Sequence, residues 1–523
     1  MVLTRPNDLP LPSVGYSSYY LPILKGFGEN IALVDIGNEE ASYTFSQVHD
    51  NSIKYANLLI KLGIGNGDVI ALCCGNCAEY LMLLLAAAEL GVSVTTCNPK
   101  HTQSEMIHQF NVVAPKLVIA DSNIVEKLEH VSEAVTAIKK IATLGKHEKY
   151  ICLRQSLNQE SSVKEYVPVT SKRDISNTPF VLPFSSGTTG KPKAVQHSQA
   201  IYTAYTLLWS ATLKLPNHGI CYCIVPMFHM FGMVTSLSAI TQGCKLIVGT
   251  KFEASSSLAA IEKYKITHAP LVPPMVIAFS KENLQKYDLS SMEYILSAAA
   301  PLPVKVGDNL RELWKTVKIN QCYGMSEAAP LSGCLEPDCP KESVGRLAFN
   351  LQVKVVDVKT GKELGPNLDG ELRYKGPQVF MGYYNAPEAT RNSFDEDNWF
   401  RSGDIGHYDE RGYIYIVDRL KDLIKYKGFQ VSPAEIERVL FENPKIADAA
   451  VFGVPDNEAG ELPRAFIVKR KESLTASEVH EYLKDRLSSY KQLRGGIIFR
   501  DSIPKAQSGK VIRRSLRSVE SKL

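Results

Sequence analysis

The sequence has no hydrophobic run long enough to cross a membrane. Its strongest apolar run covers residues 81–88 and ends at Glu89, whereas a membrane-spanning helix needs roughly 20 apolar residues. The start of the chain also lacks a basic segment followed by an apolar one, so no secretory signal is predicted. We therefore expect residues 79–90 to form a buried helix of a globular protein.

An excess of charge of either sign is also missing. The 523 residues carry a formal net charge of +4, with 45% apolar and 22% charged residues. A dedicated nucleic-acid-binding protein should show a basic face or stripe, so this class is excluded. The composition is ordinary for globular proteins, and the length predicts several domains.

The eleven cysteines show neither a disulfide framework nor a zinc pattern. Their number is odd and they are scattered, apart from the close group Cys73, Cys74 and Cys77 and the pair Cys221 and Cys223. No second Cys/His cluster follows at zinc-site spacing. We therefore predict reduced thiols, with the close group acting as small buried hydrophobes.

Strands and helices alternate through much of the chain. Strand-like runs at residues 69–72, 91–94 and 116–120 are separated by helical patterns, which predicts parallel sheets covered by helices. Runs at 220–225 and 245–249 continue this rhythm. The predicted fold is an α/β N-terminal domain, residues 1–420, with helices covering mostly parallel sheets.

The sequence pattern changes toward the C-terminus. Short alternating runs separated by glycine-rich turns predict a small β-rich subdomain at about 353–418. Beyond it, helical patterns at 434–441 and 476–487 and a strand at 449–453 predict a compact α+β domain, residues 421–523. No fixed-period repeat or low-complexity tract is present.

Residues 185–193, S-S-G-T-T-G-K-P-K, form the most informative segment. Glycine allows close backbone approach, and N–H groups, hydroxyls and lysines can hold phosphate oxygens. The segment follows a strand-like run, which favours this interpretation over a flexible linker. Pro192 stands where a Walker-type loop needs Ser or Thr after the lysine, so the segment predicts a nucleotide site of another kind.

Five further motifs are each only a weak indication of function when taken alone. A histidine lies among apolar and aromatic residues at 226–232, and an aromatic, glycine and carboxylate occur together at 321–327. Residues 401–404 (R-S-G-D) read equally well as a β-turn, and the basic run 421–428 would normally be a solvated face. A lysine ends a glycine-containing segment at 504–510.

In this order, the motifs resemble those of the adenylate-forming superfamily. This superfamily includes acyl-CoA synthetases, 4-coumarate–CoA ligases, beetle luciferases and peptide-synthetase adenylation domains, and the resemblance covers nearly the whole chain. It implies that a carboxylic acid reacts with ATP and Mg²⁺ to form an acyl-adenylate, which coenzyme A then attacks. Adenylation gives a poor electrophile a good leaving group.

The resemblance also implies an ATP and AMP site. The loop would hold the β- and γ-phosphates, Tyr323 would stack on adenine, Asp404 and Arg419 would bind the ribose, and Glu327 would ligate Mg²⁺. The complete set implied for ATP and AMP is Ser185, Ser186, Gly187, Thr188, Thr189, Gly190, Lys191, Lys193, Gln321, Cys322, Tyr323, Gly324, Ser326, Asp404 and Arg419.

Catalytic roles follow from the same resemblance. His229 would orient the carboxylate, and Lys510 would stabilise charge that develops during adenylation. Lys421 matches the hinge about which the C-terminal domain rotates, and rotation would bring Lys425 to the site. The residues implied to contact CoA are Lys251, Lys427 and Gly428.

The acyl pocket departs from both of the most similar groups. Luciferases have glycine after the histidine, where this chain has Met230, and 4-coumarate ligases have tyrosine where it has Phe231. Cys322 replaces a usual glycine, and Ala298 replaces the first glycine of another turn. We predict an apolar pocket for a medium-chain fatty acid or hydrophobic aryl acid. The predicted pocket residues are Met230, Phe231, Thr235, Ala300, Pro330 and Leu331.

Other functions compatible with these motifs are alternatives to an acid–CoA ligase. A 4-coumarate–CoA ligase and a luciferase-like monooxygenase stay as alternatives, while residues 328–331 (A-A-P-L) resemble plant ligases rather than luciferases. A non-enzymatic nucleotide binder is disfavoured because the catalytic motifs are present. No thiolation or condensation module follows, which disfavours a carrier-protein-loading domain. The final Ser521-Lys522-Leu523 predicts recognition by the peroxisomal import receptor, and hence peroxisomal localisation.

Overall fold

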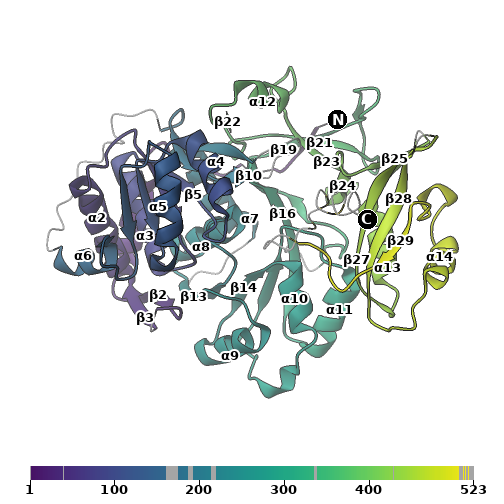
Figure 1. Ribbon diagram of the computed structural model, residues 1–523, viewed down its shortest axis with the longest axis horizontal. Coiled ribbons are helices and arrows are strands. Elements are labelled where there is room, and N and C mark those ends of the chain that lie inside the picture. Colours follow the sequence, from purple (N-terminus) through teal and green to yellow (C-terminus); the bar gives the residue numbers. More distant parts are fainter. Residues whose placement is uncertain are drawn as a thin grey trace.

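The computed structural model describes most of the chain. The described residues are 2–6, 8–38, 40–160, 175–185, 192–213, 219–334, 338–427, 429–456, 458–505, 511, 513 and 516. Within them, four β-sheets and their helices form a large N-terminal part and a smaller C-terminal part (Figure 1). The predicted α/β class is confirmed.

The first sheet has the strand order β10-β11-β9-β5-β4-β6-β7-β8, with β22 added beside β11. Strands β9, β5, β4, β6, β7 and β8 are parallel, while β10, β11 and β22 pair antiparallel. The bounds are β4 (Val69–Cys73), β5 (Ser93–Thr96), β6 (Leu117–Ala120), β7 (Lys140–Thr143), β8 (Ile151–Cys152), β9 (Pro179–Leu182), β10 (Phe184–Ser185), β11 (Lys193–Ser198) and β22 (Gly382–Tyr383).

The second sheet has the order β18-β17-β16-β15-β14-β12-β13-β2-β3 and is parallel from β16 to β2. The antiparallel strands β3, β17 and β18 lie toward its ends. The bounds are β2 (Ile31–Asp35), β3 (Ala41–Thr44), β12 (Ile220–Cys223), β13 (Lys245–Val248), β14 (His268–Leu271), β15 (Tyr294–Ser297), β16 (Lys318–Met325), β17 (Ala328–Gly333) and β18 (Arg346–Leu347).

Helices cover these two sheets. Every residue of α3 (Ala78–Leu90) is buried, so the strongest apolar run is a core helix as predicted. No helix in the described part of the chain is both long and apolar enough to span a membrane. The other helices are α1 (Tyr16–Gly26), α2 (Phe45–Lys61), α4 (Gln103–Val113), α5 (Val125–Ala134), α6 (Leu153–Gln159), α7 (Gln199–Thr212), α8 (Met230–Thr241), α9 (Ala254–Tyr264), α10 (Pro273–Phe279) and α11 (Val304–Leu313), with 3₁₀ turns at Ser122–Ile124 and Leu284–Lys286.

An antiparallel sheet of order β1-β19-β21-β23-β24, with β20 beside β19, forms the β-rich unit. The N-terminal strand β1 completes its edge, which the sequence did not predict. The bounds are β1 (Val2–Thr4), β19 (Gln352–Val356), β20 (Glu363–Leu364), β21 (Gly370–Lys375), β23 (Phe400–Tyr408) and β24 (Ile414–Arg419). Helix α12 (Pro387–Asn392) contacts strand β22 of the first sheet.

The C-terminal part, yellow in Figure 1, contains a sheet of order β26-β25-β28-β27 with β29 parallel to β28. It has its own apolar core, which includes Ile436, Val451 and Ile467. The domain boundary at Lys421 stays a prediction. The bounds are β25 (Ile424–Tyr426), β26 (Phe429–Val431), α13 (Pro433–Phe441), β27 (Ile446–Asp456), β28 (Gly460–Lys469), α14 (Ala476–Lys484), a 3₁₀ turn at Ser489–Lys491 and β29 (Gly496–Phe499).

The cysteines correct one expectation. Nine are free and buried, including Cys73, Cys74 and Cys77 in the core. Cys334 and Cys339 instead form a disulfide, with Cα atoms 6.0 Å apart. The prediction of reduced thiols throughout was therefore wrong at this pair, because the two cysteines are 5 residues apart in sequence and their Cα atoms lie at the usual disulfide distance.

Candidate active site

The phosphate loop is fixed at both of its ends. Ser185 at the end of β10 pairs in register with Lys193 at the start of β11, so the loop closes an antiparallel hairpin. The His108 ring contacts the carbonyl oxygen of Pro192 at 3.0 Å. The predicted phosphate-binding residues between these ends, Ser186, Gly187, Thr188, Thr189, Gly190 and Lys191, lie outside the described residues.

Glu327 lies at the tip of the next hairpin. Ser326 and Glu327 form the two-residue turn between β16 and β17, where Met325 pairs with Ala328. The Tyr383 hydroxyl donates a hydrogen bond of 2.9 Å to Glu327 Oε1. Mg²⁺ prefers oxygen ligands and is commonly held by one or two carboxylates together with substrate phosphates. A half-buried carboxylate at a turn near the end of the phosphate loop fits this role.

His197 on β11 supports the same hairpin. Burial lowers the pKa of its imidazole to about 3, so the ring is neutral at physiological pH. Its Nε2 lies 2.8 Å from the Ser326 carbonyl oxygen, and this acceptor places the ring proton on Nε2. The strand that leaves the phosphate loop therefore also holds the turn that carries Glu327.

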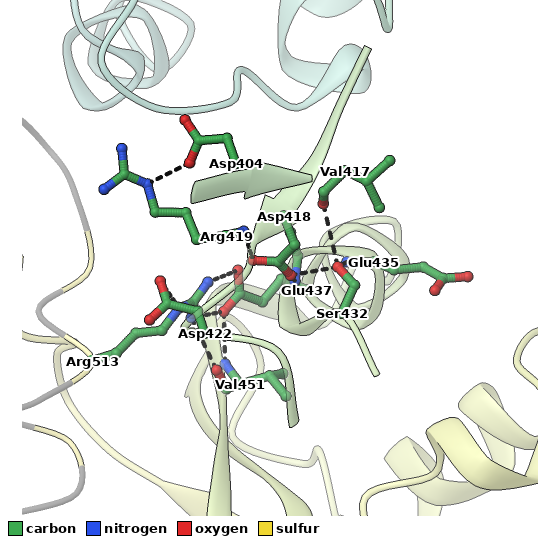
Figure 2. Close-up of polar contacts among 11 residues, drawn as sticks. Asp404, Val417, Asp418, Arg419, Asp422, Ser432, Glu435, Glu437, Val451 and Arg513 are labelled. Atoms are coloured by element: carbon green, nitrogen blue, oxygen red, sulfur yellow. Dashed lines mark hydrogen bonds and ion pairs between the residues drawn. The ribbon is translucent and has the colours of Figure 1, made fainter. Parts of the chain in front are cut away.

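Three predicted nucleotide-binding residues meet at the antiparallel sheet. The Arg419 Nε lies 2.9 Å from Asp404 Oδ1 (Figure 2). The Tyr323 hydroxyl donates to Asp404 Oδ2. Asp404 on β23 and Arg419 on β24 are register partners, so the strand pairing fixes their spacing. Burial and the Asp404 carboxylate raise the pKa of Tyr323 above its ordinary value, so its phenol stays protonated. The position of the aromatic ring is thereby set before any ligand binds.

The neighbouring predicted residues differ in their surroundings. The Gln321 amide is engaged by backbone, since it accepts from the Leu302 N–H at 3.0 Å and donates to the Lys341 carbonyl at 3.0 Å. Cys322 is buried, whereas Gly324 is exposed. Gln321 thus holds the surrounding loops, and any contact with AMP stays a prediction.

His229 is the N-cap residue of helix α8 and ends the connection that follows strand β12. Burial, together with a smaller contribution from the nearby His101, lowers the pKa of its imidazole to about 4. The ring is therefore neutral at physiological pH, so it can orient a carboxylate by hydrogen bonding but not by ion pairing. Phe228 lies against it, with ring centroids 4.7 Å apart.

The predicted acyl-pocket residues divide into two groups. Met230 and Met233 are buried in the core cluster that also contains Ala298 and Cys322. Leu331 instead packs with Tyr374 and other residues of the antiparallel sheet. Of the other predicted pocket residues, Ala300 and Phe231 are half-buried and Pro330 is buried.

The predicted CoA-binding and hinge lysines are surface residues. Lys251, Lys421, Lys425 and Lys427 are exposed, and Lys427 has a positive φ of 46°. Gly428 and Lys510 lie outside the described residues. Two described residues before and after Lys510 form ion pairs: Lys505 Nζ pairs with Asp448 at 2.6 Å, and Arg513 pairs with Glu437 at 2.6 Å.

Sequence reasoning missed Tyr383 and His197. His197 follows the phosphate loop within the strand-like run K-A-V-Q-H-S, and that position is the available signal. Tyr383 follows Gly382 just before the turn N-A-P. Neither residue carries a local pattern that points to Glu327, because the contacts join segments 56 and 129 residues apart.

Comparison with known proteins agrees with this geometry. The profile of the AMP-binding enzyme family matches residues 24–384, and that of the AMP-binding enzyme C-terminal domain matches residues 435–510. The chain is 37% identical to 4-coumarate–CoA ligase 3 of Arabidopsis thaliana, over 98% of this chain and 92% of that protein. It is 36% identical to 4-coumarate–CoA ligase 1 of Narcissus pseudonarcissus, over 98% and 94%.

Solved structures show the same fold. ATP-bound MatB from Rhodopseudomonas palustris matches with a TM-score of 0.85 and 25% identity, over 96% of this chain and 99% of that one. The o-succinylbenzoate CoA synthetase MenE from Bacillus subtilis, in complex with its acyl-adenylate intermediate, matches with a TM-score of 0.82 and 26% identity, over 97% and 99%.

The fold and the profile matches define an adenylate-forming enzyme, and the chain belongs to the AMP-binding enzyme family. Within this family it is an AMP-forming acid–CoA ligase, which uses ATP to activate a carboxylic acid.

Proposed function

We propose that this ligase activates a medium-chain fatty acid or a hydrophobic aryl acid. The acid's carboxylate oxygen attacks the α-phosphorus of ATP, the bond to the β-phosphate oxygen breaks, and pyrophosphate leaves. The CoA sulfur then attacks the acyl carbon after its thiol proton is lost, and AMP leaves with the electron pair of the acyl–oxygen bond.

The chain's residues suit these steps in the following roles. Glu327 holds Mg²⁺, which neutralises phosphate charge when it is bound, and Lys193 supplies a further positive charge. Asp404, Arg419 and Tyr323 bind the nucleoside, and neutral His229 orients the carboxylate. Lys421 is the hinge, and Lys251, Lys425 and Lys427 serve the CoA half-reaction after rotation.

The observation that carries the substrate class is the apolar setting of His229. Met230 and Met233 beside it are buried, and the Phe231 ring packs against Trp209, with ring centroids 6.0 Å apart. The Thr235 hydroxyl donates to the Phe231 carbonyl at 2.6 Å, so its proton is already engaged. A substrate phenol buried here without a partner would cost about 1–3 kcal/mol. This supports an acid without a 4-hydroxyl group.

A substrate panel tests this proposal. We expect CoA-dependent AMP release with octanoate, hexanoate or cinnamate to exceed that with 4-coumarate by about 10–100-fold in kcat/KM, and palmitate to be poor. Phe231→Tyr, which adds one hydroxyl, should raise the 4-coumarate to cinnamate ratio. A clear preference of the unmodified enzyme for 4-coumarate would contradict the proposal.

The second candidate is a 4-coumarate–CoA ligase. It is favoured by the identity of 35–37% to proteins of that name along almost the whole chain. The same panel separates the two candidates. ATP–pyrophosphate exchange without CoA-dependent AMP release would instead point to the luciferase-like alternative.

We also propose that the enzyme enters peroxisomes through its last three residues, Ser521-Lys522-Leu523, which lie outside the described residues. The import receptor reads this tripeptide as an address. Deleting it should leave a fluorescently labelled enzyme in the cytosol with unchanged catalysis. Persistent peroxisomal fluorescence of the truncated enzyme would show that another segment is the address.

A further inference from the structure

A short strand joins the two phosphate-site hairpins. β22 pairs with β11, and the Met381 N–H donates to the Gln196 carbonyl while the Tyr384 N–H donates to the Ala194 carbonyl, both at 2.9 Å. On the other side, the Phe380 N–H donates to the Glu327 carbonyl at 2.8 Å. Residues 380–384 therefore connect the strand after the phosphate loop to the turn that carries Glu327.

The Tyr383 side chain lies between the charged groups of these hairpins. Its hydroxyl is 2.9 Å from Glu327 Oε1, and the Lys193 ammonium lies 5.0 Å from the centre of its ring. The ring also packs edge-on against Phe380, with centroids 5.1 Å apart. The Tyr383 N–H donates to the Thr390 hydroxyl at 2.9 Å, which fixes the backbone behind the ring.

A carboxylate that ligates a metal works best when a neighbouring donor holds its orientation. The phenol can donate only one hydrogen bond, and it is given to Oε1, so Oε2 keeps its lone pairs for a cation. The contact of the same ring with Lys193 also fixes the spacing between this carboxylate and a lysine that is predicted to bind phosphate. The phenol thus orients the carboxylate and sets its spacing from positive charge.

We propose that Tyr383 is a positioning residue for adenylation, which presents Glu327 to the divalent cation of ATP. This inference rests on the proposed role of Glu327 as the Mg²⁺ ligand. Tyr383 touches neither the reacting atoms nor the cation, and acts through the carboxylate.

Nucleotide binding with and without metal tests the proposal. The dissociation constant of α,β-methylene-ATP is measured by calorimetry in excess Mg²⁺ and again in EDTA. The ratio of the constant in EDTA to the constant in Mg²⁺ gives the contribution of the metal to binding. Tyr383→Phe should reduce this ratio by about 10–100-fold, the usual effect of losing such a supporting hydrogen bond. The dissociation constant in EDTA should not change. Tyr384→Phe, which removes the adjacent hydroxyl, should match the unmodified enzyme.

Kinetics provide a second measurement. In ATP–pyrophosphate exchange, Tyr383→Phe should raise the half-saturating Mg²⁺ concentration by about 10–100-fold, while saturating Mg²⁺ restores most of kcat. A purely structural role would weaken binding equally in Mg²⁺ and EDTA, and that result would overturn the inference. So would an unchanged ratio.

Glu327→Gln separates this inference from the proposed function. If Glu327→Gln reduces the ratio and Tyr383→Phe does not, the role of Tyr383 is wrong and the cation site stands. If Glu327→Gln leaves the ratio unchanged, the cation site itself is wrong, and the inference fails with it.

Discussion

Replacement of Lys510 by alanine is expected to slow adenylation by about 10²–10³-fold and to spare thioester formation. Negative charge develops on the α-phosphate in the first half-reaction, and loss of one group that stabilises such charge typically has an effect of this size. The second half-reaction starts from a finished acyl-adenylate and does not need that stabilisation. ATP–pyrophosphate exchange measures the first step, and release of AMP from a supplied acyl-adenylate plus CoA measures the second.

Lys505 provides the matched control. It lies in the same segment, but its ammonium is paired with Asp448 at 2.6 Å within the C-terminal part. Lys505→Ala should therefore alter stability more than either half-reaction. An equal loss of both half-reactions in Lys510→Ala would contradict the assignment of Lys510 and the rotation of the C-terminal domain.

Replacement of Glu437 by alanine is expected to destabilise the C-terminal part by about 3–5 kcal/mol, because it leaves a buried guanidinium without its main partner. Glu437 on α13 accepts hydrogen bonds from Arg513 at 2.6 and 3.2 Å and from the Val451 N–H at 2.7 Å (Figure 2). Only 16% of the Arg513 side chain is exposed, and its other carboxylate contact, Asp422, is 3.6 Å away. Hydrogen–deuterium exchange of α13 and β27 measures the loss locally.

The double variant Glu437→Met with Arg513→Met tests the cause of this loss. Removing both charges together avoids an unpaired buried ion, so at least half of the lost stability should return. A loss below about 1 kcal/mol in Glu437→Ala, or a double variant no more stable than the single one, would show that the pair is not the source.

The sequence predicted the elements whose residues repeat regularly. The apolar run of α3 and the strand β4 appear within one residue of the expected bounds. The strand expected at 91–94 instead begins at Ser93, because Gly91 is the left-handed C-cap of α3 with φ 66°. Strands as short as β22 have no period to detect, and β1 owes its place to pairing with a strand some 350 residues later.

The site was predictable to the extent that it is local. Glycine, lysine and carboxylate motifs identify the segments that approach ATP, and the structure places Tyr323, Asp404 and Arg419 in contact. The support behind these residues is non-local. His197 and Tyr383 reach the Glu327 turn only through the pairing of β11 with β22 and the folding of β16 onto β17. A linear motif does not encode these contacts.

The link between Asp418 and helix α13 would oppose the proposed rotation of the C-terminal part. Asp418 Oδ2, at the end of β24, accepts hydrogen bonds from the Ala434 N–H at 3.0 Å and from the Ser432 hydroxyl. Rotation about the predicted hinge at Lys421 would break this cap, which is worth about 0.5–2 kcal/mol. By itself, a bias of that size leaves between about 3% and 30% of resting molecules in the other orientation. If the proposed rotation takes place, CoA would need only a modest preference for one orientation to shift this balance at each turnover.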